Sequence, residues 1–402
     1  MAYFSRRLVV VVLSAAALVC GLAVTSGPAS ATVNTATAVP SPSPSLTENP
    51  LNSVSCVSSD WCVAVGYEKL AGKPQLLILM YDGTSWTQAT APNVDANWDA
   101  AYSVSCVSTN FCVAVGFSAS YSVTHVISWD GTSWTTVVSP NVSGVDNAPF
   151  GVSCFSSNSC VTVGLTRERS GSYLRQNMAM VWDGISWSLE TPPNVGAGNN
   201  ELSGVSCVSP TYCVAVGVYD NAGTQASLSM LWDGASWTTV ATPSVGAGPN
   251  SLEDVSCVST TYCIAVGTFD VEGMPQPLAL MWDGSRWTSL TSPDVSDGYT
   301  TLNGISCVTT TFCVAVGIST VGEDFPPLIV VWDGSTWSWL SGQVAISSGI
   351  FTSVSCDSLT TCMTVGQSTL PSLSLTAALT ETSVNPTSTT AGTDPIAPAF
   401  TG

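Results

Sequence analysis

Short apolar runs alternate with polar, turn-forming stretches along most of the chain, and the alternation repeats about every fifty residues. In each unit a run ending in Val-Ser-Cys precedes Cys-Val-Ala-Val-Gly or a close variant, as in residues 54–66. A longer apolar run and a short Thr-rich run follow. Runs of this length, rich in Val, Thr and aromatic residues and bounded by Gly, Ser and Pro, predict four β-strands per unit.

Six of the seven units share the motif [Trp/Tyr]-Asp-Gly-x-x-Trp between the third and fourth runs. Asp-Gly between two apolar runs predicts a hairpin, because Gly accepts a positive φ and Asp bonds the turn backbone. Four antiparallel strands repeated seven times predict an all-β fold, a seven-bladed β-propeller, whose closed ring removes exposed sheet edges. The motifs span Tyr81–Trp86, Trp129–Trp134, Trp182–Trp187, Trp232–Trp237, Trp282–Trp287 and Trp332–Trp337.

The seventh unit has no such motif, so its outer strand must come from elsewhere. Residues 33–40 resemble residues 237–243 in composition and in their distance from the next Val-Ser-Cys. We therefore expect an N-terminal strand within a linker at 32–50 to complete the last blade and close the ring. The propeller is predicted over residues 51–384, followed by a disordered Thr- and Pro-rich tail at 385–402.

Fourteen of the fifteen cysteines form seven pairs with the same spacing, and successive pairs lie 48 to 53 residues apart. Metal binding and redox chemistry are the alternatives to a structural crosslink. Equal pairs in an exported chain with one histidine favour one disulfide per blade, each worth roughly 2 kcal/mol in the chain-entropy model. The predicted pairs are Cys56 with Cys62, Cys106 with Cys112, Cys154 with Cys160, Cys207 with Cys213, Cys257 with Cys263, Cys307 with Cys313, and Cys356 with Cys362.

The N-terminus has the order of a secretory signal peptide. Arg6 and Arg7 precede an apolar run, and the small residues Ala29-Ser30-Ala31 follow it, which predicts cleavage after Ala31. An uncleaved anchor and a twin-arginine signal are the alternatives. No later stretch is apolar enough to span a membrane, so the mature chain is expected to be secreted or at the cell surface.

The net charge of the chain limits the classes of partner that it is expected to bind. The chain has 8 basic and 27 acidic residues, and loss of Arg6 and Arg7 leaves 6 against 27, a net charge of −21. A strongly acidic surface disfavours nucleic acid and anionic lipid. We expect a protein or polysaccharide partner and no cofactor.

The order Val-Ser-Cys, Ala-Val-Gly, Asp-Gly-x-x-Trp resembles the Asp-box (BNR) repeat of bacterial sialidase-like and photosystem II assembly-factor-like propellers. The Asp-box has Ser/Thr-x-Asp-x-Gly-x-x-Trp, whereas Asp and Gly are adjacent here. The resemblance implies a six- or seven-bladed propeller outside the cytoplasm that binds carbohydrate or protein. It does not imply sialidase activity, since three of the four mature arginines lie in one loop and cannot surround a central site.

No catalytic or metal-binding residue is predicted. The Asp-Gly aspartates recur at a turn whose geometry favours Asp followed by Gly, so they are expected to be structural. The motif tryptophans are expected to pack between blades. His125 stands alone on an apolar strand, without a Gly-x-Ser-x-Gly motif nearby. The adjacent acids Glu253-Asp254 and Glu323-Asp324 would point to opposite faces of a strand, which disfavours a glycosidase pair.

Binding residues are sought where the repeats differ. The variable segments are the loops between the second and third strands and the links before each new unit, and both emerge on one face. This predicts a non-catalytic binding or scaffold propeller, and a carbohydrate-active enzyme that uses loop carboxylates is the alternative. An enzyme would gather acidic, Tyr or Arg side chains from several blades at the channel mouth. The candidate ligand-binding residues are Arg167, Arg169, Tyr173, Arg175, Trp98, Tyr121 and Phe325.

Overall fold

The computed structural model describes residues 35–42, 49–95, 98–118, 123–292, 298–320, 325–340, 348–368 and 374–380. All of them belong to one compact unit, Ala31–Gly402. They form strands, turns and loops, so no helix long and apolar enough to cross a membrane occurs in these ranges. The predicted signal peptide at 1–31 and the predicted tail at 385–402 lie outside the described residues.

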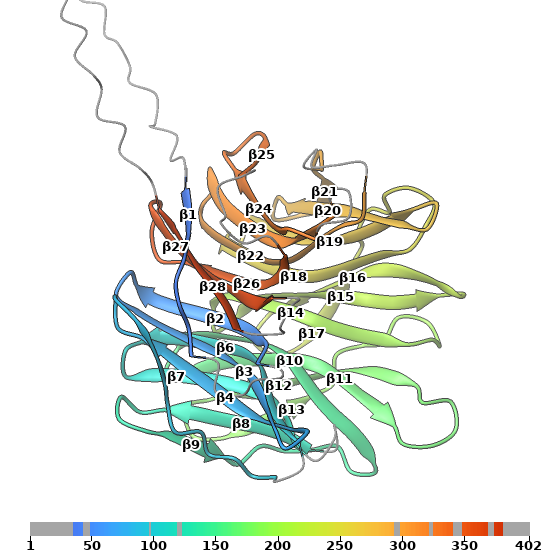
Figure 1. Cartoon of the computed structure of the whole chain (residues 1–402). Helices are drawn as coiled ribbons and strands as arrows, with labels where there is room; N and C mark the ends of the chain where they lie inside the picture. The colour runs from blue at the N-terminus through green and yellow to red at the C-terminus, as the bar shows by residue number, and fades with distance from the viewer. Residues whose placement is uncertain are drawn as a thin grey trace, which may run out of the picture. The chain divides into compact units, whose positions relative to one another are not determined.

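Six blades each consist of four consecutive antiparallel strands, and they follow one another in sequence order (Figure 1). The strands of each blade pair in the order inner, second, third, outer. The inner strands are β2 (Leu51–Ser58), β6 (Asp99–Ser108), β10 (Val145–Ser156), β14 (Asn200–Ser209), β18 (Asn250–Ser259) and β22 (Thr300–Thr309). The second strands are β3 (Trp61–Leu70), β7 (Phe111–Ser118), β11 (Ser159–Glu168), β15 (Tyr212–Asn221), β19 (Tyr262–Val271) and β23 (Phe312–Ser319). The third strands are β4 (Lys73–Tyr81), β8 (Val123–Trp129), β12 (Arg175–Trp182), β16 (Thr224–Trp232), β20 (Met274–Trp282) and β24 (Pro327–Trp332). The outer strands are β5 (Trp86–Gln88), β9 (Trp134–Val137), β13 (Trp187–Glu190), β17 (Trp237–Val240), β21 (Trp287–Ser289) and β25 (Trp337–Trp339).

The last repeat forms a sheet of a different kind, which we call the terminal sheet. It contains β26 (Gly349–Cys356), β27 (Thr361–Ser368) and β28 (Ser374–Thr380), with β1 (Thr35–Ala38) paired antiparallel to β28 (Figure 1). The predicted count of seven blades is therefore corrected: six blades, not seven, are built from one continuous repeat. The reason is that no Asp-Gly-x-x-Trp turn follows β28, so this repeat supplies only three strands of its own.

The motif tryptophans pack between blades. In each of the six blades the two aromatic residues of the motif face each other across the third and outer strands, with ring centroids 5.2 to 5.8 Å apart. Trp237 is 6% exposed and packs with Val161 and Ala179 of the preceding blade. Trp287 also donates its indole N–H to Ser229 of the preceding blade at 3.0 Å. These contacts confirm that the tryptophans are core residues.

The serine of each Val-Ser-Cys links one sheet to the next. Its hydroxyl oxygen accepts a hydrogen bond from the backbone N–H of the Cys in the same position of the following inner strand. The bond occurs seven times at 2.9 to 3.0 Å, and the last joins Ser355 of the terminal sheet to Cys56 of the first blade. Satisfying a buried backbone donor in this way binds neighbouring sheets without a shared strand ladder.

All seven predicted disulfides are present, which confirms the interpretation of the cysteines as structural crosslinks. Each joins two cysteines that lie directly opposite each other on the inner and second strands, with Cα atoms 3.9 to 4.0 Å apart. Each therefore ties the inner strand, which carries the inter-sheet serine, to its own sheet. The bonded pairs are Cys56 with Cys62, Cys106 with Cys112, Cys154 with Cys160, Cys207 with Cys213, Cys257 with Cys263, Cys307 with Cys313, and Cys356 with Cys362.

Every inner strand carries a β-bulge at the same place, opposite the Gly of Ala-Val-Gly. A Cβ atom on Gly217 would collide with the carbonyl oxygen of Glu201, and the same collision recurs in the other six sheets. The glycine therefore makes room for the bulge. A bulge leaves one residue of the inner strand unpaired and re-aims its side chain, and these seven residues define the candidate site below.

We predict that Ser206→Ala lowers the free energy of unfolding by about 1 to 3 kcal/mol, because the N–H of Cys257 loses its acceptor. Urea denaturation of the oxidised protein measures the loss. Ser157→Ala, on an exposed turn, is the control and should change stability by less than about 0.5 kcal/mol. Equal effects of the two substitutions would contradict a role for the serine bonds.

Candidate binding face and central recess

The seven bulge residues meet in a recess of about 200 Å³ at the centre of the inner strands. Each sheet contributes one of these residues, so the seven side chains together determine the chemical character of the cavity. We call this cavity the central recess. Its bulge residues are Asn52, Tyr102, Phe150, Ser203, Glu253, Asn303 and Thr352.

Three of the bulge residues tie their strand to the next sheet. The side-chain amides of Asn52 and Asn303 donate to backbone carbonyls of the following inner strand at 2.7 and 2.9 Å. The hydroxyl of Thr352 donates to the carbonyl of Leu51 at 2.7 Å. These side chains are part of the scaffold, and they belong to the terminal sheet and the two blades that flank it.

The bulge residues of the four consecutive blades two to five differ in kind. Tyr102 stacks on Phe117 with centroids 4.7 Å apart and meets Phe150 edge-on at 5.7 Å. Ser203 and Glu253 continue this arc. One side of the recess is thus aromatic, and the other carries an acid.

Glu253 and Asp254 both line the recess, but only Glu253 also lines its mouth. Glu253 is the bulge residue of this strand, whereas the carboxylate of Asp254 accepts the backbone N–H groups of Val255 and of Ile305 in the next blade. The acids Glu201 and Glu253 and the hydroxyl-bearing Tyr102 therefore gather at the mouth from three blades, an arrangement that the sequence pattern alone did not reveal.

Burial dominates the electrostatics of these acids. It raises the pKa of Asp254 to about 7, although the carboxylate accepts backbone N–H bonds from Val255 and Ile305 at 2.8 and 2.9 Å that act in the opposite direction. Burial also raises the pKa of Glu253, and the nearby charge of Glu201 adds to the increase. Glu253 is exposed on the side of the recess, and protein surrounds it on its other sides. Both acids are thus less well solvated as anions than acids on an open surface.

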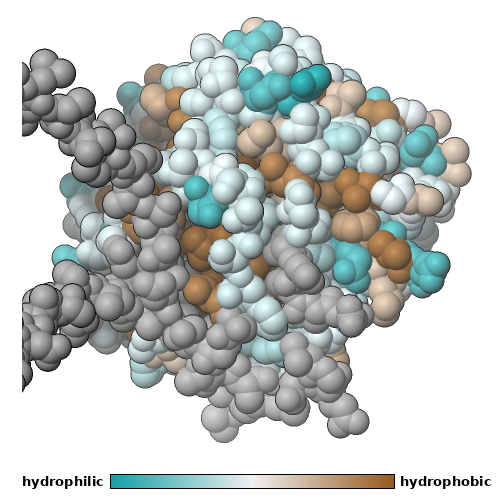
Figure 2. Space-filling model, turned by 90° about the horizontal axis from the view of Figure 1, so that it is seen from above, coloured by the Kyte–Doolittle hydropathy of each residue, from teal (hydrophilic) through white to brown (hydrophobic). Residues whose placement is uncertain are grey.

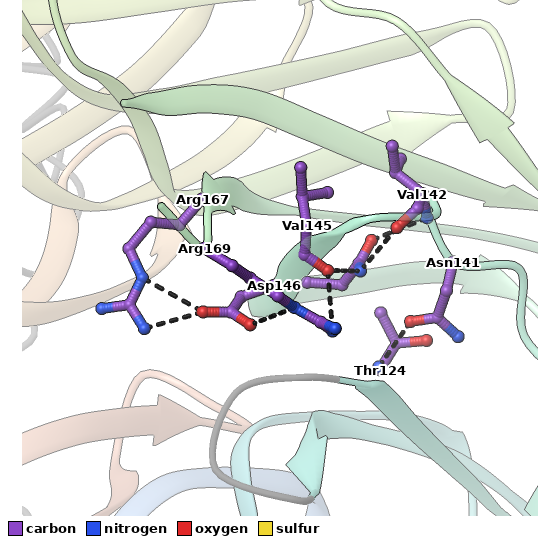
Figure 3. Close-up of polar contacts among 8 residues, drawn as sticks. Thr124, Asn141, Val142, Val145, Asp146, Arg167 and Arg169 are labelled. Atoms are coloured by element: carbon purple, nitrogen blue, oxygen red, sulfur yellow. Dashed lines mark hydrogen bonds and ion pairs between the residues drawn. The ribbon is translucent and has the colours of Figure 1, made fainter. Parts of the chain in front are cut away.

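Two arginines of the predicted cluster, Arg167 and Arg169, are held by an acid of their own blade (Figure 3). Arg167 and Arg169 both bind the carboxylate of Asp146, at 2.8 and 3.0 Å, and Arg169 also donates to the carbonyl of Val145. Two cationic side chains thus share one carboxylate, which fixes the base of the loop. The sequence indicated the arginines but gave no sign of Asp146.

Arg175 reaches from β12 to the next blade, where it binds Glu201 at 2.9 Å. A cleft of about 200 Å³ opens there between Arg167, Arg175 and Glu201, with Phe150 and Leu165 among its apolar residues. Phe150 and Glu201 line both this side cleft and the mouth of the central recess. The arginine loop and the recess therefore form one continuous surface.

Trp98 and Phe325 are not gathered into this site, and Tyr173 lies on the arginine loop (residues 167–175) but lines neither the side cleft nor the recess. Trp98 is partly buried and packs with the cluster around Phe117. Tyr173 is 59% exposed at a positive-φ turn, and Phe325 is 46% exposed on another blade. Tyr121 lies outside the described residues, as does the acidic pair Glu323-Asp324.

His125 forms a buried pair that the sequence did not predict. Its Nδ1 lies 2.6 Å from Asp99, and Nε2 is buried without a hydrogen-bond partner. Asp99 also accepts the N–H of Val94 at 2.8 Å. The pair holds the link before the second blade and does not line the central recess.

The Asp-Gly aspartates serve the turns. Each side chain accepts the backbone N–H groups two and three residues on, as Asp82 does from Thr84 and Ser85 at 2.9 and 2.8 Å. The hydroxyl of Thr84, which donates to Asp82 at 2.7 Å, and these backbone bonds lower the pKa of Asp82 to about 2. Over the described ranges, no three His, Cys, Asp or Glu side chains are grouped closely enough to hold a metal ion.

Comparison with known proteins shows the fold class and no more. No family model matches the chain, and no curated protein matches it in sequence. Among solved structures, "YCF48 bound to D1 peptide" is similar with a TM-score of 0.54 at 15% identity, covering 87% of this chain and 98% of that one. At this identity the likeness establishes a β-propeller, consistent with the four-stranded blades. It does not establish the Asp-box or sialidase-like relationship.

We predict that stability falls as pH rises from about 4 to 7. Asp254 binds a proton in the folded state over this range and not in the unfolded state, so the free energy of unfolding declines by about 1.4 kcal/mol per pH unit. Urea denaturation between pH 4 and 8 measures the slope. Asp254→Asn should flatten the slope, whereas the matched change Glu190→Gln on β13 should leave it. An unchanged slope in Asp254→Asn would refute the assignment.

Proposed function

We propose that this protein is an exported, non-catalytic binding propeller that recognises a protein partner through the face bearing the variable loops. The observation that carries the proposal is the continuous surface formed by the arginine loop, the side cleft and the mouth of the central recess. Its residues come from the parts of the repeats that differ, whereas the shared residues are used in turns, disulfides and inter-blade bonds.

The character of the surface favours a protein over a polysaccharide. The exposed Tyr173 lies on the same loop as Arg169 and Arg175, and such a mixture of aromatic and charged residues is typical of protein interfaces. On the side of the molecule seen in Figure 2, most residues are pale and few are strongly hydrophilic, in keeping with a chain in which 9% of the residues are charged. The similar propeller YCF48 is itself bound to a peptide. Seven disulfides support an oxidising location outside the cytoplasm.

The test is binding of residues 32–402 to arrays of extracellular proteins and glycans. We expect a protein ligand whose affinity falls at least about tenfold in the double variant Arg169→Gln/Tyr173→Ser, because an interface of this kind concentrates its energy in Tyr and Arg. Ile185→Ser is the matched control, since Ile185 is 86% exposed on an Asp-Gly turn of the opposite face. Loss of binding in the control alone would move the site to that face.

A carbohydrate-active enzyme is the second candidate, and one observation favours it. Glu201 and Glu253 come from neighbouring blades to the same recess, and the raised pKa of Glu253 is a property of a general acid. Against it, Glu201 is engaged by Arg175.

We expect no hydrolysis or elimination when a panel of polysaccharides is incubated with the protein. Reducing-end and unsaturated-product assays measure the two reactions. Activity that disappears in Glu253→Gln and persists in Glu190→Gln would establish the enzyme and overturn the binding proposal.

A further inference from the structure

The mouth of the central recess has two kinds of wall on one arc of the ring. Tyr102 and Phe150, from the second and third blades, form the aromatic side. Glu201 and Glu253, from the fourth and fifth blades, form the acidic side. The described residues that line the mouth include no Lys or Arg. Aromatic faces and carboxylates together attract a cation.

Glu253 is incompletely satisfied within the protein. Its Oε1 accepts a hydrogen bond from Ser251 at 3.1 Å, and no described residue donates to Oε2. The side chain lines the recess, and protein surrounds it closely enough to raise its pKa. A carboxylate held this way lacks the counter-charge that would offset its desolvation.

Glu253 occupies the bulge position of its inner strand, where some other repeats have a hydrogen-bond donor. Asn52 and Asn303 use the same bulge position to donate a hydrogen bond to the next sheet, and Thr352 does likewise. An ionised carboxylate has no proton to donate. Glu253 is not shown to make an inter-sheet bond of this kind, and its carboxyl group lies at the mouth of the recess.

We propose that the central recess receives the guanidinium group of an arginine side chain from a protein partner. Its N–H groups bind Glu253, and its planar face lies against one of the two rings, Tyr102 or Phe150, which are inclined at 66° to each other. The proposal rests on the proposed function, because the arginine belongs to the partner recognised by the loop face. Arg175 of this chain already shows the chemistry at the rim, where its guanidinium binds Glu201.

Arginine fits these walls better than lysine. Its flat guanidinium stacks on aromatic rings and offers paired N–H donors to a carboxylate, whereas an ammonium is a compact and strongly hydrated point charge. The partner segment must also be cationic overall to approach a chain with a net charge of −19.

The experiment titrates the oxidised protein with a blocked Gly-Arg-Gly tripeptide at pH 8 and follows binding by NMR chemical shifts. The control ligand carries citrulline, which is nearly isosteric with arginine and uncharged. We expect the arginine peptide to bind at least about tenfold more tightly, as a charged hydrogen bond in an enclosed site requires. Glu253→Gln should abolish this preference without lowering the melting temperature, and Glu190→Gln should preserve it.

The outcomes separate this inference from the proposed function. Equal binding of the arginine and citrulline peptides, or an unchanged preference in Glu253→Gln, overturns the arginine site. A lysine peptide that binds as tightly as the arginine peptide also overturns it, in favour of a general cation site. If a protein ligand needs Arg169 and Tyr173 but not Glu253, the binding function stands and the arginine site falls. An arginine preference without any protein ligand on the arrays supports the site and counts against the proposed function.

Discussion

The hydrogen bond from the backbone N–H of Cys to the hydroxyl of Ser in the next inner strand is the contact on which the rest of this structure depends. Adjacent sheets of a propeller share no strand ladder, so their spacing must be set by side chains. Here a serine at the same position of each sheet sets the spacing, and the adjacent disulfide fixes the strand that carries this serine. The tryptophans then fill the wedge between outer strands, where the sheets diverge.

The bulge is the second constraint, and it follows from the first. The inner strand must keep its Ser and Cys in register with the neighbouring inner strand, and the bulge lies in the same strand, before these two residues. Gly217 and its counterparts provide the space for the extra residue of the bulge. The fold thus presents one bulge residue per sheet to the central recess. The scaffold specifies where that side chain points, and leaves its identity to each repeat.

This division explains what the sequence predicted and what it missed. Strands, Asp-Gly turns and disulfides recur with a fixed spacing, so they were predictable from local chemistry. The central recess was not predictable, because its mouth is lined by bulge residues such as Glu253, whose direction does not follow from the alternation of an ideal strand. Partners far apart in sequence, such as Asp146 for Arg167 and Glu201 for Arg175, depend on how strands pair and blades pack. The count of blades needed correction because one repeat lacks its own outer strand.

A residue that differs from its counterparts in the other repeats points to function most clearly when it makes no bond that stabilises the fold. The pair of Asp99 and His125 differs from the other repeats, yet Asp99 still stabilises the segment that precedes β6, because it accepts the N–H of Val94. Asp254 also differs from its counterparts and still bonds the next blade through Ile305. Glu253 alone among these acids makes no bond to another strand and faces a cavity. Among these acids Glu253 therefore contributes least to the scaffold, and its position at the mouth of the recess is the reason that we place a cationic ligand of the partner there.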